Sequence, residues 1–172
     1  MSNYVVAIVA LAVGLVACVT DVRTRRIPNA LTFGAAAAAL LFHAIADGRA
    51  GAGMAVVGWM VGVAVFLPFF LLGGMGAADV KLLAALGAWL GPRDAFWLAV
   101  YASLAGGVMA IIVALGRGYL RTAVRNVGTL LRYWWLVGPR PLAAVSLERS
   151  DGPRLAYAVP IFVGTVVTVW LR

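Results

Sequence analysis

Long apolar stretches occupy most of this 172-residue chain and restrict its possible folds more than any other feature. Six can be drawn, at roughly 4–20, 30–46, 54–72, 79–91, 95–115 and 155–171. Most have nearly the length of about 20 residues that a helix needs to cross the core of a bilayer. Hydrophobic residues make up 64% of the chain and the mean hydropathy is +1.00, which excludes an ordinary soluble domain. We therefore predict one all-α, polytopic membrane domain over residues 1–172, with about six transmembrane helices.

The basic residues between these stretches predict the orientation of the chain. The formal net charge of +8 is typical of nucleic-acid-binding proteins as well, but here the arginines separate apolar runs. An N-terminus outside the membrane leaves three basic residues outside (Arg49, Arg93 and Arg172) and eleven on the cytoplasmic side (Arg23, Arg25, Arg26, Lys81, Arg117, Arg121, Arg125, Arg132, Arg140, Arg149 and Arg154). By the positive-inside rule the N-terminus is outside, and the expected partners include lipid but no nucleic acid.

The longest polar connection, residues 116–154, has two interpretations. Arg121, Arg125 and Arg132 recur at helical spacing among apolar residues, and 133–135 are aromatic. This pattern is typical of an amphipathic helix lying at the inner membrane surface, with its arginines near anionic headgroups. The alternative is a plain basic loop that only fixes topology.

The fourth apolar stretch, 79–91, differs from the others because it is short and begins with charged residues. Its length corresponds to about 18 Å of helix, little more than half a bilayer. It carries Asp79 and Lys81, and ionisable groups at membrane depth are costly and usually functional. The glycines of 73–76 predict a tight bend before it.

Few residues in the chain offer chemistry other than that of carboxylates. The single His43 and the single Cys18 lie in apolar helices and are interpreted as packing residues, so we expect no metal and no cofactor. Of the six carboxylates, four are interpreted as solvated acids in turns or loops: Asp47, Asp94, Glu148 and Asp151. Asp21 and Asp79 alone lie at ends of membrane helices on the same side, where they can face each other.

Two neighbouring carboxylates form a recognisable device for hydrolysis. Because like charges cannot both ionise cheaply, one keeps a proton near neutral pH and acts as the acid, while the other activates water. The position of Asp79 at a helix N-terminus favours its ionised form, so Asp79 is predicted to be the base and Asp21 the acid. The alternative is structural: Asp21 balances nearby arginines, and Asp79 is an N-cap paired with Lys81.

Three motifs resemble those of the type IV prepilin peptidases, a family of membrane aspartic proteases. They are Arg26-Ile27-Pro28-Asn29-Ala30-Leu31-Thr32 after the first aspartate, Gly76-Ala77-Ala78-Asp79-Val80-Lys81-Leu82, and Ala156-Tyr157-Ala158-Val159-Pro160-Ile161-Phe162-Val163-Gly164. The resemblance implies that the catalytic residues are Asp21 and Asp79, and that Pro28, Asn29, Gly76, Ala78 and Lys81 support the motifs. One departure concerns Ala78, where the family signature has a glycine with access to positive φ.

The resemblance also implies an activity and a location. A member would remove the short basic leader of a prepilin or pseudopilin at the cytoplasmic face of the bacterial inner membrane, by aspartic endopeptidase chemistry. A single cysteine excludes the paired Cys-x-x-Cys motifs of the methylating members, so cleavage without methylation is expected, as in tight-adherence (Flp-type) systems. Glu148 or Asp151 are candidate leader contacts. The rival hypotheses are an ion- or proton-coupled transporter or channel subunit that uses Asp79, and an inactive scaffold for pilus assembly.

Overall fold

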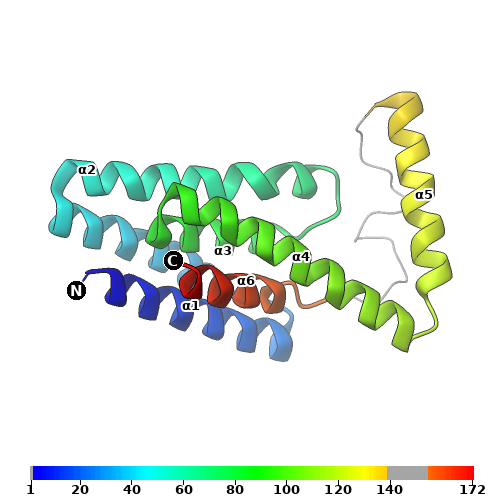
Figure 1. Ribbon diagram of the computed structural model, residues 1–172, viewed down its shortest axis with the longest axis horizontal. Coiled ribbons are helices and arrows are strands. Elements are labelled where there is room, and N and C mark those ends of the chain that lie inside the picture. The colour runs from blue at the N-terminus through cyan, green and yellow to red at the C-terminus, as the bar shows by residue number, and fades with distance from the viewer. Residues whose placement is uncertain (1, 139–154) are drawn as a thin grey trace.

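The fold is all-α in the part of the chain that the computed structural model describes, residues 2–138 and 155–172 (Figure 1). The helices are α1 (Ser2–Thr24), α2 (Asn29–Leu71), α3 (Ala77–Leu90), α4 (Pro92–Gly116), α5 (Leu120–Val137) and α6 (Ala158–Trp170). Each predicted apolar stretch coincides with a helix over most of its length, although residues 155–157 precede α6, and α5 forms within the predicted loop 116–154. Residues 139–154 of that loop, with Glu148 and Asp151, lie outside the described residues.

Helix α2 is a hairpin of two helical arms rather than a straight rod. Gly48 has the non-helical angles φ 61° and ψ −144°, which a glycine adopts without a steric cost. The arms before and after it run back along each other (Figure 1). The predicted stretches 30–46 and 54–72 occupy the two arms, so the reversal between them needs a single residue.

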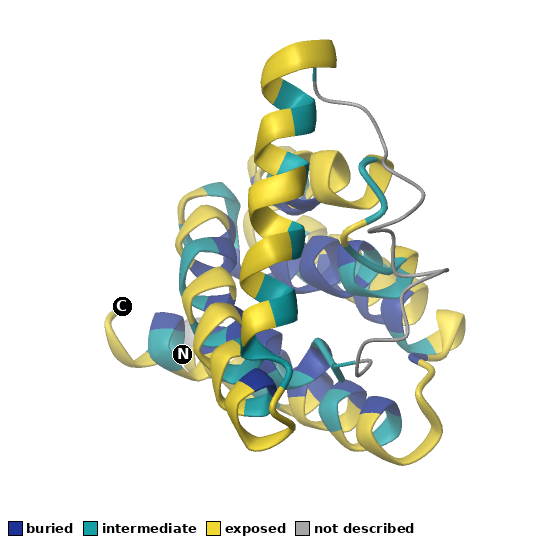
Figure 2. Cartoon of the chain, turned by 90° about the vertical axis from the view of Figure 1, so that its right-hand side faces the viewer, coloured by how far each residue is buried: buried dark blue, intermediate teal, exposed yellow. Residues whose placement is uncertain are grey.

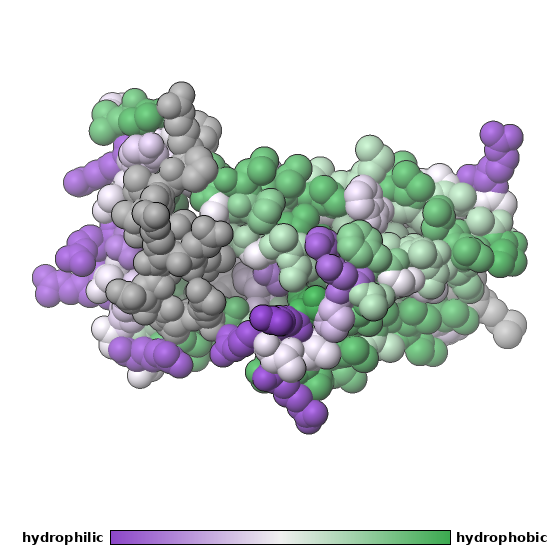
Figure 3. Space-filling model, turned by 180° about the vertical axis from the view of Figure 1, so that it is seen from behind, coloured by the Kyte–Doolittle hydropathy of each residue, from purple (hydrophilic) through white to green (hydrophobic). Residues whose placement is uncertain are grey.

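The helices have the length and surface of a membrane protein. Among the residues that the structure describes, three helices are long and apolar enough to cross a membrane, Tyr4–Thr24, Asn29–Leu71 and Pro92–Gly116, whereas α3 and α6 have 14 and 13 residues. Hydrophobic side chains cover much of the bundle's outside, and hydrophilic ones gather at the end near α5 (Figure 3). This confirms the predicted class, an all-α integral membrane protein.

Helix α3 is the centre of the bundle. Every residue from Leu82 to Leu90 is buried, and α1, α2, α4 and α6 all contact this helix. The second arm of α2 approaches it through glycines: a Cβ on Gly62 would lie 2.7 Å from the Cα of Ala84, and one on Gly58 would meet the Gly87 carbonyl oxygen. Such close backbone contact is typical of membrane helix pairs with small residues at the crossing.

Several helix ends that carry the predicted motifs meet at one end of the bundle. The last turn of α1, the start of α2, and the N-termini of α3 and α6 all lie there (Figure 1).

At the other end, Arg172 forms an ion pair with Asp94 at 2.6 Å, so the interpretation of Asp94 as a merely solvated turn acid was wrong. His43 Nε2 lies 3.1 Å from the Trp89 carbonyl oxygen, in agreement with a packing role.

Candidate active site

Asp21 lies near the end of α1 and is 8% exposed. The backbone N–H of Ala158, the first residue of α6, donates a hydrogen bond to its Oδ2 at 3.3 Å. The N-terminus of a helix carries partial positive charge and donors without partners, both of which favour a carboxylate. Ala158 belongs to the third sequence motif, so this motif holds the carboxylate of Asp21, which lies 137 positions earlier in the chain.

Asp79 lies in the first turn of α3 and is not its N-cap. The N-cap is Gly76, whose backbone N–H donates a hydrogen bond to the Asp79 carboxylate. A Cβ on Gly76 would lie 3.1 Å from Asp79 Oδ2, tighter than most real contacts of that kind. The predicted N-cap role of Asp79 is therefore wrong, because the helix begins two residues earlier. Because Gly76 has no side chain, the Asp79 carboxylate has room to lie beside the Gly76 backbone N–H.

The electrostatics of Asp79 follow from its surroundings. Asp79 lies outside the three segments that are long enough to cross a membrane. Burial and, secondarily, the negative charge of Asp21 raise its pKa from 3.8 to about 7, against the lowering effect of the Gly76 hydrogen bond. The expectation that the helix N-terminus keeps Asp79 ionised is thus overturned, because desolvation outweighs it. Near neutral pH a substantial fraction of Asp79 is therefore protonated.

Lys81 points away from this pair of carboxyl groups. Its ammonium donates a hydrogen bond to Asn29 Oδ1 at 3.1 Å and lies 5.4 Å from the centre of the Phe33 ring. Pro28 is the N-cap of α2, and its carbonyl oxygen accepts N–H bonds from the helix's first turn. Lys81 and Asn29 therefore tie α3 to the start of α2, and the alternative pairing of Asp79 with Lys81 is wrong.

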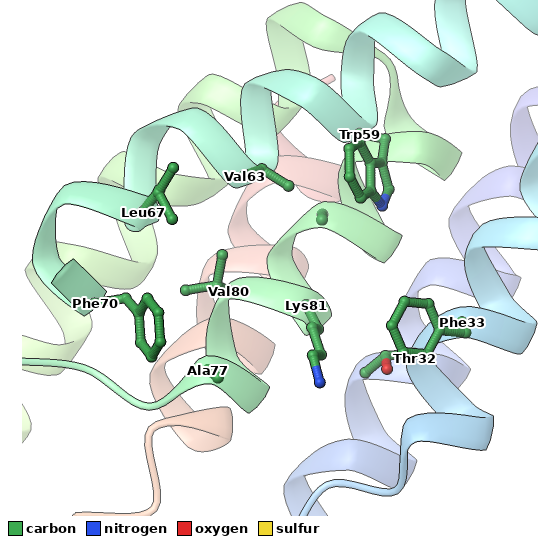
Figure 4. Close-up of a pocket in the computed structure, with 10 residues that line it drawn as sticks. Thr32, Phe33, Trp59, Val63, Leu67, Phe70, Ala77, Val80 and Lys81 are labelled. Atoms are coloured by element: carbon green, nitrogen blue, oxygen red, sulfur yellow. The ribbon is translucent and has the colours of Figure 1, made fainter.

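An apolar pocket of about 260 Å³ lies beside α3, between the two arms of α2 (Figure 4). Phe33 and Trp59 come from different arms, and Val80 and Lys81 come from α3. Neither Asp21 nor Asp79 lines it. The pocket lies on the Lys81 side of α3, and the carboxyl groups belong to a different face.

Tyr157 is a site residue that the sequence analysis did not single out. Its ring lies 6.0 Å from that of Phe66 and fills the space beside Gly106, where a Cβ would lie 2.8 Å from the hydroxyl. Burial raises the pKa of its hydroxyl, which also interacts with Ser103 and senses the charge of Asp79. The available signal was its place in the third motif, directly before Ala158.

Ala78 occupies an ordinary helical position. It is the second residue of α3 and does not adopt a positive φ; among the described residues other than glycine, only Arg25 does. Its side chain packs against the core. The backbone at this position therefore does not require the glycine of the family signature.

The described residues contain no group of three or more histidine, cysteine or acidic side chains that could hold a metal ion. Asp21 and Asp79 come from α1 and α3, are both largely removed from solvent, and the charge of Asp21 acts on Asp79. A carboxylate beside a carboxylic acid can take a proton from water and give one to a carbonyl oxygen. Such a pair of carboxyl groups can act as the general base and the general acid of a hydrolysis.

Comparison with known proteins finds a matching family and curated relatives. The sequence matches the type IV leader peptidase family over residues 8–111. It is 40% identical over 93 residues to a prepilin leader peptidase/N-methyltransferase of Dickeya chrysanthemi, covering 50% of this chain and 32% of that protein. A protein of the same name from Aeromonas hydrophila is 38% identical over 106 residues, covering 58% and 36%.

The chain thus aligns with about a third of the length of these curated relatives. No solved structure matches it. The family match includes Asp21, Asp79 and the motif residues Pro28, Asn29, Gly76 and Lys81. The chain belongs to the type IV leader peptidase family.

Proposed function

We propose that this chain is an aspartic endopeptidase that removes the short basic leader of type IV prepilins or pseudopilins. The observation that carries the proposal is the pair Asp21 and Asp79, which two separate helices bring to one end of the bundle, with the charge of Asp21 acting on Asp79. The family match and the names of the relatives support prepilins as the substrate class.

The mechanism uses the two carboxyl groups in different protonation states. Asp21, whose Oδ2 accepts the hydrogen bond from the Ala158 N–H, takes a proton from a water molecule as the water oxygen attacks the scissile carbonyl carbon. Asp79, which keeps its proton up to about pH 7, donates that proton to the carbonyl oxygen. When the tetrahedral intermediate collapses, the C–N bond breaks and the leaving amine takes the proton held by Asp21. The step from intermediate to product returns the proton from the former carbonyl oxygen to Asp79.

The proposed location follows from charge and from the bundle's geometry. With an N-terminus outside the bacterial inner membrane, the excess of arginine lies inside and both carboxyl groups face the cytoplasm. A leader that stays cytoplasmic, followed by an apolar helix in the membrane, has its cleavage point at this level. The carboxyl groups at the ends of α1 and α3 lie where that peptide bond arrives.

The proposal includes cleavage without N-methylation, as in Flp-type systems. The printed sequence has one cysteine, Cys18, and therefore no pair of Cys-x-x-Cys motifs. The relatives named above carry both activities in their names, and the chain aligns with only part of them. Methylation is thus a separate outcome of the experiment that tests cleavage.

The experiment is reconstitution of the purified protein with a purified prepilin and S-adenosylmethionine. Mass spectrometry of the product gives both the cleaved bond and any added methyl group. We expect one cut after a glycine, immediately before the apolar helix, and no methyl group on the new N-terminus. An intact prepilin after long incubation contradicts the peptidase proposal, whereas a methylated product contradicts only its second part.

A further inference from the structure

Helix α5 leaves the bundle at a defined level of the membrane. The candidate span α4 ends at Gly116, and α5 begins at Leu120 after a link that turns at Gly118, whose φ is 65°. Three link residues reach at most about 10 Å, so the start of α5 is held near the end of a membrane span. In two perpendicular views α5 lies across the long axis of the bundle (Figures 1 and 2).

One face of α5 is apolar and exposed. Val124, Val127, Leu131 and Trp135 follow one another at intervals of three or four residues, which places them in one stripe along the helix. Their side chains are 56% to 87% exposed, and α5 has no buried residue. Among the described helices α5 contacts only α4. We call these four residues the apolar stripe.

A row of positive charge runs beside the apolar stripe. At 100° per residue, Arg121, Arg125 and Arg132 fall within about 40° of one another and about a quarter turn from the stripe. Helix α5 contains no acidic residue. None of the three arginines forms an ion pair with a residue in the described part of the chain. We call them the arginine row.

We propose that α5 is a membrane-surface helix: its apolar stripe enters the interface of the bilayer, and its arginine row binds the phosphates of anionic lipid headgroups. The link to α4 places the helix at the bilayer surface, and its orientation lets the whole stripe reach that surface at once. Guanidinium groups bind phosphate oxygens through paired hydrogen bonds, and their long stems let them reach headgroups from the edge of the stripe. The proposal does not depend on peptidase activity.

The first test compares two faces of α5 in the complete protein. In a Cys18→Ser background, Leu131→Cys and the matched control Thr129→Cys are labelled with an environment-sensitive fluorophore. Both positions are exposed, and they lie on opposite sides of α5 because two residues turn a helix by about 200°. The protein is reconstituted in vesicles of phosphatidylcholine and phosphatidylglycerol, with either a lipid-attached quencher or iodide in the water.

We expect the lipid quencher to reduce the fluorescence of the label at position 131 at least about twice as strongly as that at position 129. Iodide is expected to quench position 129 more strongly than position 131. Equal quenching at the two positions overturns the proposal. Protection of position 131 from both quenchers also overturns it, because a protein partner or a second copy of the chain then covers the stripe.

The second test concerns the arginine row. Removing phosphatidylglycerol, or raising the salt concentration, is expected to weaken lipid quenching at position 131 in the wild-type background. Replacing Arg121, Arg125 and Arg132 together by glutamine is expected to abolish that lipid dependence, and replacement by lysine to preserve it. Lipid dependence that survives the glutamine variant shows that the arginine row does not bind the headgroups.

Discussion

Ionisation of the buried Asp79 carboxyl group is expected to destabilise the folded protein at about pH 7 and above. Its pKa is raised from 3.8 to about 7, so the folded chain holds this proton more tightly than the unfolded chain. Stability therefore falls as pH rises from about 4 through about 7, and a change of one in pKa corresponds to about 1.4 kcal/mol. The full loss is about 4 kcal/mol above pH 7.

The substitution Asp79→Asn removes this cost while preserving the shape and an oxygen for the Gly76 N–H. We expect the variant to be more stable than wild type by about 4 kcal/mol at about pH 8, and by less than about 1 kcal/mol at about pH 4. For a chain of this size the gain at the higher pH corresponds to an unfolding midpoint raised by about 10 °C. The same variant is expected to have lost leader cleavage.

The assay is thermal unfolding of the detergent-solubilised protein across this pH range, followed by tryptophan fluorescence. Asp47→Asn is the matched control, because Asp47 is exposed and directly precedes Gly48, at the turn between the two arms of α2. A stability difference between Asp79→Asn and wild type that stays constant with pH would refute the reasoning, since burial would then not have raised the pKa of Asp79.

Two further predictions concern glycine and alanine positions. Gly62→Ala places a Cβ 2.7 Å from Ala84 Cα and is expected to cost about 1–3 kcal/mol of unfolding free energy. The control Gly53→Ala, whose Cβ would have no atom within 4 Å, is expected to cost nothing. Equal unfolding midpoints for the two variants would contradict the close α2–α3 crossing. Gly76→Ala is expected to slow cleavage without unfolding the protein, because the added Cβ presses on Asp79 Oδ2. Ala78→Gly is expected to lower the free energy of unfolding by about 1 kcal/mol and to leave the cleavage rate unchanged. Faster cleavage by Ala78→Gly would show that the family glycine has a role that the helical backbone at 78 does not reveal.

Much of the fold follows from apolar length and from glycine and proline. All six predicted apolar stretches coincide with helices over most of their length, and the boundary between the stretches 79–91 and 95–115 falls at Gly91, whose φ is 86°. The predicted bend at 73–76 is also present: Gly73, two residues after the end of α2, has a φ of 77°. These features are local, so hydropathy and backbone freedom suffice to predict them.

Contacts between distant segments were harder to predict. The pairing of Lys81 with Asn29 spans 52 positions, and the approach of Ala158 to Asp21 spans 137, so no local pattern contains them. The protonation state of Asp79 was predicted wrongly because the helix dipole can be read from the sequence, whereas burial cannot. Helix α5 was one of two open interpretations, and periodicity alone does not decide between a helix and a basic loop.

The most direct test of the account is cleavage of a prepilin by Asp21→Asn and Asp79→Asn, measured as single-turnover rates in the same membrane environment. Each variant keeps the shape of the side chain and removes one member of the acid–base pair, with Asp47→Asn as the control. The account predicts that each variant loses about 10³-fold or more in rate while the control is unchanged. A rate within about tenfold of wild type in either variant contradicts the proposal that Asp21 and Asp79 together carry the reaction.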